Sequence, residues 1–283
     1  MISRRSVLAG LAGMTLTGCA GSETRVATYG PDAQGRRMTV AQATGPTSRM
    51  KGLDGVIDIS HLNTVTDFTL IRRNSNIHGI LHKASEGGDW VDDAYTMRRP
   101  QAEAAGLLWG AYHFGTHEYS GEDQARNFLA VAQPGARTLL ALDFEPNERH
   151  PKNSMDLAQA EAFVRVVYRE TGRLPLVYTH PNWANGIAYG RSRAFLKRCV
   201  GPDSVIAQCD LWLADYRESP EIPNAWAGRG WRLWQYAGNE SGDDAAYGSA
   251  SRAVVGVDRC DRNLFAGDVA ALHRYWGGRT VTS

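Results

Sequence analysis

Residues 138–145 read Thr-Leu-Leu-Ala-Leu-Asp-Phe-Glu, a short apolar run that ends in two acids. Runs of this length and composition are typical of buried β-strands. Because side chains alternate along a strand, Asp143 and Glu145 should point to one face while Leu142 and Phe144 point to the other. At a rise of about 3.3 Å per residue, the Cα atoms of the two acids would lie roughly 6.6 Å apart. The stretch therefore predicts a strand that presents a pair of carboxyl groups at its end.

Apolar runs of the same kind recur along the chain after Gly52. They lie at residues 55–60, 79–84, 107–114, 174–179, 211–216 and 231–236, with a weaker run at 254–265. Helical patterns separate several of them, which favours a mainly parallel sheet with helices outside. Roughly eight strands favour closure of that sheet. We therefore predict an α/β fold, an irregular single-domain (β/α) barrel resembling a TIM barrel, over residues 53–283.

The helical patterns carry their own boundary signals. Ser120 is a candidate N-cap for one helix, and Ser154 is a candidate N-cap for another that Gly172 would end. A further helix is expected over 92–106, where Pro100 should interrupt it or shift its start.

Composition narrows the class of protein. The 283 residues are 43% hydrophobic and 22% charged, which excludes wholesale disorder. Lysine and arginine number 31 against 30 aspartates and glutamates, without a long basic block, so nothing points to nucleic acid as a partner. His113 and His117 have a spacing found in metal sites but no thiolate or acidic partner nearby. We expect no metal and no cofactor.

The first residues look like an export signal. Arg4 and Arg5 precede a short apolar run at 9–17, which is far shorter than the roughly 20 residues of a membrane-spanning helix. Leu-Thr-Gly-Cys at 16–19 resembles the bacterial lipobox, which implies a signal peptide over 1–18 and lipidation of Cys19. The alternative is an ordinary cleaved signal without lipidation. The export route, general secretory or twin-arginine, stays open. Residues 19–52 are polar and would tether a lipoprotein to the membrane of the cell envelope, on the periplasmic or outer-membrane side if the cell has two membranes.

Three further cysteines would then lie in an oxidising compartment. A bridge between Cys199 and Cys209 would close a short loop and leave Cys260 free. Sequence does not supply the geometry that such a bridge requires.

Polar residues stand at or near the carboxyl ends of most of the apolar runs. In a (β/α) barrel the carboxyl ends of the strands meet at one rim, where active sites form. The residues expected there are Asp58, Ser60, Lys83, Glu86, Tyr112, His113, Asp143, Glu145, Tyr178, Asp215, Tyr216, Gln235, Tyr236 and Asp261. Two acids as close as Asp143 and Glu145 disfavour joint ionisation, so one pKa could rise far enough to keep a proton near neutrality. A general acid for a glycosidic oxygen needs such a proton.

An ordered series of motifs resembles glycoside hydrolase family 25, the lysozymes of the Chalaropsis type. The series runs through nearly the whole body of the chain, from Gly55 to Phe265. Its members are Asp58-Ile-Ser60, Lys83-Ala-Ser-Glu86-Gly87, Gly110-Ala-Tyr112-His113-Phe114, Asp143-Phe-Glu145, Leu211-Trp-Leu-Ala-Asp-Tyr216, Trp234-Gln-Tyr236 and Asp261-Arg-Asn263-Leu-Phe265. The resemblance implies hydrolysis of peptidoglycan at the β-1,4 bond from N-acetylmuramic acid to N-acetylglucosamine.

The resemblance also implies roles for individual residues. Glu145 would protonate the leaving oxygen, and Asp143 would orient the acetamido group of the substrate or tune Glu145. Asp58 and Asp261 would be further rim carboxylates. The sugar groove would be lined by Tyr112, Tyr216, Trp234 and Gln235, with Tyr178 as a further candidate for binding substrate, whereas Trp212 is expected to pack.

Three questions stay open at this point. A Cα spacing does not distinguish a retaining from an inverting mechanism, and assistance by the substrate's acetamido group is a third route. A glucosaminidase or chitinase-like hydrolase could use acidic strand ends too. A non-catalytic glycan-binding lipoprotein is the other alternative, although binding alone would not require four acids.

Overall fold

The computed structural model describes residues 52–187, 198–217, 219–238 and 254–276. The expected signal peptide, Cys19 and nearly all of the tether lie outside these residues. The strands are β1 (Leu53–Ile59), β2 (Gly79–Glu86), β3 (Trp90–Val91), β4 (Leu108–Phe114), β5 (Leu139–Asp143), β6 (Leu176–Thr179), β7 (Leu211–Ala214), β8 (Trp231–Ala237) and β9 (Asp261–Phe265). The helices are α1 (Phe68–Asn74), α2 (Asp93–Ala104), α3 (Gly121–Ala132), α4 (Leu157–Thr171), α5 (Pro181–Ala184), α6 (Val205–Gln208) and α7 (Val269–Trp276).

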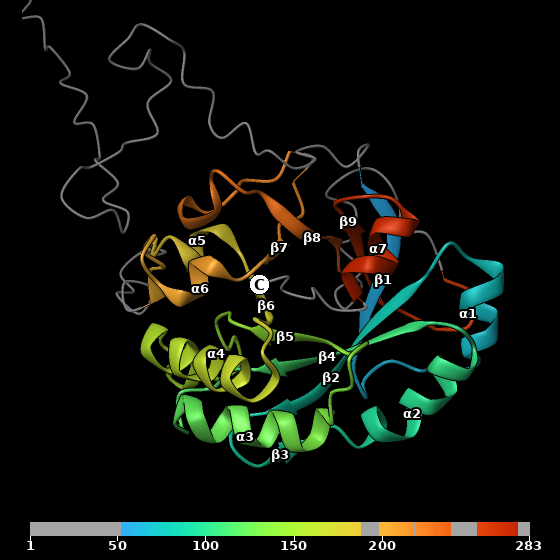
Figure 1. Ribbon diagram of the computed structural model, residues 1–283, viewed down its shortest axis with the longest axis horizontal. Coiled ribbons are helices and arrows are strands. Elements are labelled where there is room, and N and C mark those ends of the chain that lie inside the picture. Colours follow the sequence, from blue (N-terminus) through green and yellow to red (C-terminus); the bar gives the residue numbers. More distant parts are fainter. Residues whose placement is uncertain (1–51, 188–197, 218, 239–253, 277–283) are drawn as a thin grey trace, which may run out of the picture.

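The sheet closes into a barrel, as predicted. Its strand order is β1-β9-β8-β7-β6-β5-β4-β2-β3, and a further pairing of β1 with β2 completes the ring, so that β3 lies outside it as an addition to β2. Neighbouring strands of the ring are parallel except at β9, which runs antiparallel to both β1 and β8. Figure 1 shows α1 to α4 along the outer side of the strands that they connect. The fold is an α/β barrel of the TIM-like kind.

Local sequence signals explain where the helices begin and end. The Ser120 side chain accepts a hydrogen bond from the backbone N–H of Asp123, which confirms this residue as the N-cap of α3. Gly172 ends α4 at a φ of 68°, a conformation that glycine adopts without steric cost. The N-cap of α4 is Asp156 rather than Ser154, because Asp156 and Gln159 form a reciprocal capping box.

The helix α2 differs in one respect from the expectation. Its start is fixed by Asp92, whose side chain accepts a hydrogen bond from the backbone N–H of Ala94. Pro100 lies inside the helix and does not interrupt it. A proline removes a single backbone donor from the helical ladder, and the rest of α2 continues past it.

Two apolar layers hold the barrel together. One fills its interior, and the other lies between the strands and the surrounding helices. From α7, Leu272 and Trp276 belong to the interior layer, and Trp276 donates a hydrogen bond from Nε1 to the carbonyl of Trp109 at 2.8 Å. A Cβ on Gly79, the first residue of β2, would lie 2.9 Å from the Trp276 ring. Trp276 therefore closes the end of the barrel where the parallel strands begin.

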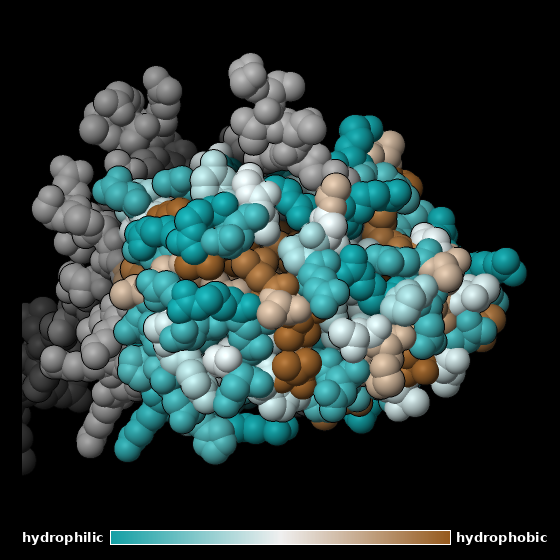
Figure 2. Space-filling view, turned by 60° about the horizontal axis from the view of Figure 1, so that its bottom comes forward, coloured by the Kyte–Doolittle hydropathy of each residue, from teal (hydrophilic) through white to brown (hydrophobic). Residues whose placement is uncertain are grey.

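The outer face over the helices is mainly hydrophilic, with hydrophobic residues scattered across it (Figure 2). Among the helices in the described part of the chain, none has the length and apolar character needed to cross a bilayer.

The expected bridge from Cys199 to Cys209 is wrong. Cys209 is a free thiol, completely buried, and so is Cys260, which is 5% exposed. Cys209 follows α6 directly, and its Sγ donates to the carbonyl of Val205 at 3.5 Å. The thiol thus faces the core.

Candidate active site

The first strand, the fifth and the last bring three acids to one rim of the barrel. Asp143 is the final residue of β5, and Leu142 and Phe144 pack in the outer apolar layer on the opposite face, as the alternation predicted. Asp58 lies near the end of β1 and is paired in register with Asp261. Asp261 begins its strand instead of ending it, contrary to the expectation. Because β9 is antiparallel to its neighbours, its first residue still lies at the rim where they finish.

Two hollows adjoin at this rim. One, of about 630 Å³, is lined by Asp58, Asp143, Glu145 and Asp261, and by Tyr112, Trp212 and Gln235 among others. The other, of about 700 Å³, lies toward His180, Asp215 and Arg217. Both hollows are lined by Glu145, Pro146, Glu148, Tyr178 and Tyr216. Glu145 therefore lies at the junction of a groove that extends to either side of it.

Asp143 is a buried acid with unusual surroundings. It is 8% exposed, and its Oδ1 has no hydrogen-bond partner among the described residues. Burial raises the pKa of Asp143 well above its ordinary value, and the negative charge of Glu145 raises it further, whereas Lys83 opposes the shift. The close pair expected from residues 138–145 thus has one member that favours its protonated form.

Gln235 joins the remaining rim residues into one network. Its Nε2 donates to both oxygens of Asp58, at 3.1 Å each, and to Oδ2 of Asp261 at 3.2 Å. Its Oε1 accepts hydrogen bonds from the hydroxyls of Tyr178 and Tyr216, both at 2.9 Å. With its donor and acceptor groups engaged on opposite sides, the amide is held in one orientation and fixes two carboxylates and two tyrosines relative to one another.

Two residues that sequence reasoning did not assign to the site complete this network. Asn263 donates from Nδ2 to Asp58 Oδ2 at 2.7 Å, and it accepts from Trp212 Nε1 at 2.6 Å. Trp212 was expected to pack, and its ring does pack in the interior layer, but it also lines the groove. Tyr112 and Tyr178 contact this ring edge to face, at centroid distances of 6.0 and 4.9 Å.

Trp234 does not line the groove, so that expectation is wrong. The side chain is completely buried in the outer apolar layer, and its Nε1 donates to the backbone carbonyl of Asp215. Neighbouring residues of a strand face opposite sides, so Trp234 and Gln235 do not both reach the groove. Alternation along β8 would have shown this from the sequence.

The groove also has a wall near β2 and β3. Lys83 and Glu86 were expected at the rim, whereas Trp90 and His61 were not assigned to the site. Lys83 forms an ion pair with Glu86 at 2.7 Å, and its Nζ lies 5.0 Å from the centroids of the Trp90 and Phe114 rings. His61, which follows β1, packs beside Trp90 at a centroid distance of 5.3 Å. All of these residues line the hollow of about 630 Å³ that contains Asp58.

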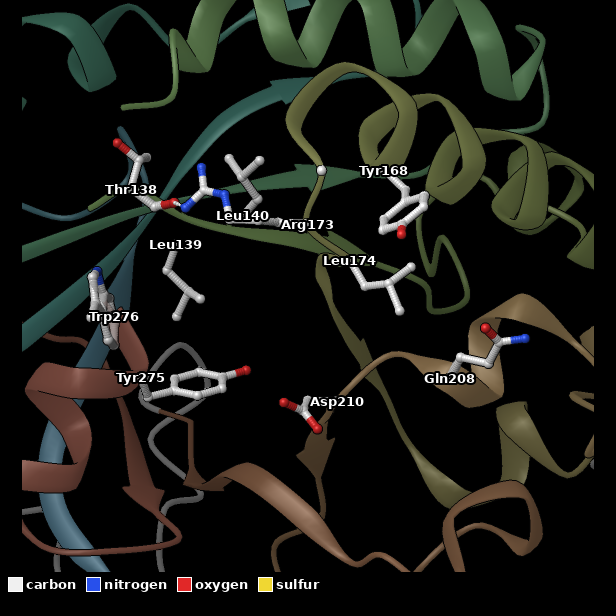
Figure 3. Close-up of a pocket in the computed structure, with 11 residues that line it drawn as sticks. Thr138, Leu139, Leu140, Tyr168, Arg173, Leu174, Gln208, Asp210, Tyr275 and Trp276 are labelled. Atoms are coloured by element: carbon white, nitrogen blue, oxygen red, sulfur yellow. Dashed lines mark hydrogen bonds between the residues drawn. The ribbon is translucent and has the colours of Figure 1, made fainter. Parts of the chain in front are cut away.

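A separate pocket of about 250 Å³ lies at the opposite end of the barrel. Figure 3 shows Leu139, Leu174 and Tyr275 around it, with Asp210 at its edge. Asp210 forms ion pairs with Arg229 and Arg232 at 3.1 and 3.7 Å. This pocket is mainly apolar, and Asp210 is the one acid among the described residues that line it.

The described residues contain no group of three or more His, Cys, Asp or Glu side chains arranged to hold a metal ion. His113 lies in the core, where its ring nitrogens contact Ser85 and Gln124, and burial lowers its pKa to about 3. His117 pairs with Gln159 on the surface.

Comparison with known proteins identifies the family. The model of "Glycosyl hydrolases family 25" matches residues 57–245. The chain belongs to this family. Lysozyme M1 of Streptomyces globisporus is 27% identical over 259 residues, which cover 84% of this chain and 78% of that protein. The N,O-diacetylmuramidase of Chalaropsis is 27% identical over 197 residues, or 62% of this chain and 82% of that one.

Solved structures agree with this assignment. The lysozyme of Streptomyces coelicolor superposes with a TM-score of 0.62 at 25% identity, over 79% of this chain and 97% of that one. A muramidase of Acremonium alcalophilum gives a TM-score of 0.60 at 26% identity, over 78% and 98%. The resemblance to family 25 is confirmed, and this chain is a glycoside hydrolase.

The family 25 match ends before β9. Asp58, Asp143, Glu145 and Gln235 lie inside the matched residues, whereas Asp261 and Asn263 lie beyond them. The hydrogen bonds from Gln235 and Asn263 nevertheless tie β9 to the acids of this glycoside hydrolase. β9 is therefore part of the rim that carries these acids.

Proposed function

We propose that this glycoside hydrolase cleaves the β-1,4 bond between N-acetylmuramic acid and N-acetylglucosamine in peptidoglycan. The observation that carries the proposal is the acid pair at the junction of the two hollows: a buried Asp143 that favours its protonated form, and a more exposed Glu145. The names of the relatives, a lysozyme and an N,O-diacetylmuramidase, support the choice of peptidoglycan as substrate.

Glu145 is the general acid in this proposal. It lines both hollows, so it borders the bond between sugars that occupy them. Asp143 shares the proton of the pair and assists. An acetamido N–H that donates to Asp143 would stabilise its ionised form, which leaves the proton on Glu145 for delivery to the glycosidic oxygen. Binding the correct sugar thus prepares the acid.

The same contact favours participation of the substrate's own acetamido group. Oδ1 of Asp143 has no hydrogen-bond partner among the described residues and can accept the N–H while the acetamido oxygen attacks the anomeric carbon. Asp58 and Asp261, fixed by Gln235, line the same hollow and would stabilise the positive charge that develops on the sugar ring. Removal of the N-acetyl group from the substrate should therefore abolish cleavage at that sugar.

The proposal places the enzyme at the cell envelope. The motif at 16–19 would lead to a lipidated Cys19, and the tether to residue 52 would let the barrel reach the glycan strands from the membrane surface. The substrate partner is the glycan of the wall, and the membrane partner is the lipid around the acylated cysteine.

One experiment tests the assignment of the bond. Purified peptidoglycan is digested, the new reducing ends are reduced with borohydride, and the reduced sugar is identified. Muramitol is the expected product. Glucosaminitol would assign a glucosaminidase instead, and a digest without new reducing ends would leave only glycan binding.

A further inference from the structure

His61 stands at the groove wall in a fixed orientation. Its backbone N–H donates to Asp92 Oδ2 at 2.9 Å, and its Nδ1 lies 3.0 Å from the same oxygen. Asp92 itself is completely buried and is held by its role as the N-cap of α2. A carboxylate that accepts from Nδ1–H selects the tautomer of the ring and its direction. The ring is further held by Trp90, at a centroid distance of 5.3 Å.

The other ring nitrogen is available to a ligand. The His61 side chain is 43% exposed and lines the same hollow as Asp58 and Asp143. With Nδ1 turned toward the buried Asp92, the exposed edge of the ring carries Nε2. In the described part of the chain, Nε2 has no hydrogen-bond partner. In the neutral ring that donates through Nδ1, Nε2 is an acceptor.

We propose that His61, oriented by Asp92, binds the glycan strand by accepting a hydrogen bond at Nε2 from a sugar hydroxyl or acetamido N–H. The inference rests on the proposed function, because it takes the glycan as the ligand of this hollow. His61 is a substrate-binding residue and Asp92 a positioning residue. Neither is needed for the acid chemistry of Asp143 and Glu145, so the contribution is to affinity.

The test separates binding from catalysis by using Glu145→Gln as the parent, which keeps the groove but cannot deliver a proton. Binding of a peptide-free glycan oligomer is measured by calorimetry. Adding His61→Asn preserves a polar atom near the position of Nδ1 and removes Nε2. Loss of one hydrogen bond should weaken binding about three- to tenfold. Adding His61→Gln, whose amide extends to the position of Nε2, should recover part of that loss.

His117→Asn in the same parent is the matched control, since this histidine is also half exposed, pairs with Gln159 and lines neither hollow. Its binding should equal that of the parent. In the otherwise wild-type enzyme, His61→Asn should raise KM by the same three- to tenfold and leave kcat within about twofold.

Equal affinity of the parent and the His61→Asn variant would overturn the inference. So would an equal loss in the His61→Gln variant, because a polar atom at the position of Nε2 would then contribute nothing to binding. Failure of the proposed function has a different signature: the wild-type enzyme would produce no muramitol, whatever the binding constants of these variants.

Discussion

Asn263 of the last strand donates a 2.7 Å hydrogen bond to Asp58 of the first. This bond crosses the seam at which β1 and β9 close the barrel, and Trp212 fixes the asparagine from the other side. The orientation of the Asp58 carboxylate on β1 thus depends on the Asn263 amide on β9 and, through it, on the Trp212 indole on β7.

Glu145→Gln should reduce turnover on peptidoglycan by about 10²- to 10⁴-fold, because the amide keeps the shape of the side chain but has no proton to deliver to the leaving oxygen. Glycan binding should persist. Rates are measured from new reducing ends and affinity by calorimetry. Glu122→Gln, an exposed acid in the first turn of α3, should match the wild type. Turnover within a few-fold of wild type in Glu145→Gln would refute its role as the acid.

Asp143→Asn should be nearly inactive yet more stable at neutral pH. The folded pKa of Asp143 lies above its unfolded value of about 3.9, so between the two the folded chain binds more protons than the unfolded one. Asp143 therefore costs stability that is absent below about pH 4 and grows as the pH rises through the folded pKa. Its replacement should raise Tm at pH 7, by roughly 2–4 °C per kcal/mol, and have little effect near pH 4. Calorimetric scans at both pH values measure the difference, and a Tm gain independent of pH would contradict this account.

Gln235→Glu should destabilise the fold at pH 7 by on the order of 3 kcal/mol. The new carboxyl would be buried at a position that is 2% exposed, against Asp58 and Asp261, which lose their amide donor. Burial and like charges would raise its pKa above the unfolded value of about 4.3, so the penalty should shrink as the pH falls toward 4. Urea unfolding at pH 7 and pH 4 tests this expectation. An equally stable variant at pH 7 would show that the network is dispensable.

Trp212→Phe should affect catalysis, whereas Trp234→Phe should affect stability. The first removes the hydrogen bond that orients Asn263, so kcat/KM should fall about three- to tenfold. The second removes a buried hydrogen bond to Asp215 and some packing outside the groove, which should cost about 1–2 kcal/mol of stability and leave KM unchanged. Steady-state kinetics and denaturation on both variants decide which tryptophan serves the substrate. A change of KM in the Trp234 variant alone would reverse the assignment.

Cys19→Ser should release the protein from the membrane. If the motif at 16–19 is a lipobox, the variant has no acylation site, and it should move from the detergent phase to the aqueous phase on Triton X-114 partition. Specific activity on soluble glycan fragments should stay the same. Identical partition of wild type and variant would remove the basis for a lipoprotein.

Much of the barrel and half of the site follow from short-range rules. Alternation along residues 138–145 placed Asp143 and Glu145 on one face, and the serine before α3 marked its start. The same rule, applied to β8, places Trp234 and Gln235 on opposite faces of the strand. The expectation that both line the groove was wrong because the resemblance assigned the whole motif to the site. The direction of β9 and the partners of Asn263 depend on contacts between distant segments, which no local pattern encodes. Whether Cys209 forms a bridge depends on where its side chain points in the folded core, and there the thiol is free.

The seam between β1 and β9 also sets when the enzyme can become active. Asp58 and Asn263 are 205 positions apart in the chain, and the rim is incomplete until both are in place. During synthesis, a nascent chain that has released β1 to β8 still lacks the strand that orients Asp58. Closing so long a loop is a late event in folding. On the proposed function, a partly made chain therefore carries the acid pair without the assembled rim and becomes active only after β9 has been added.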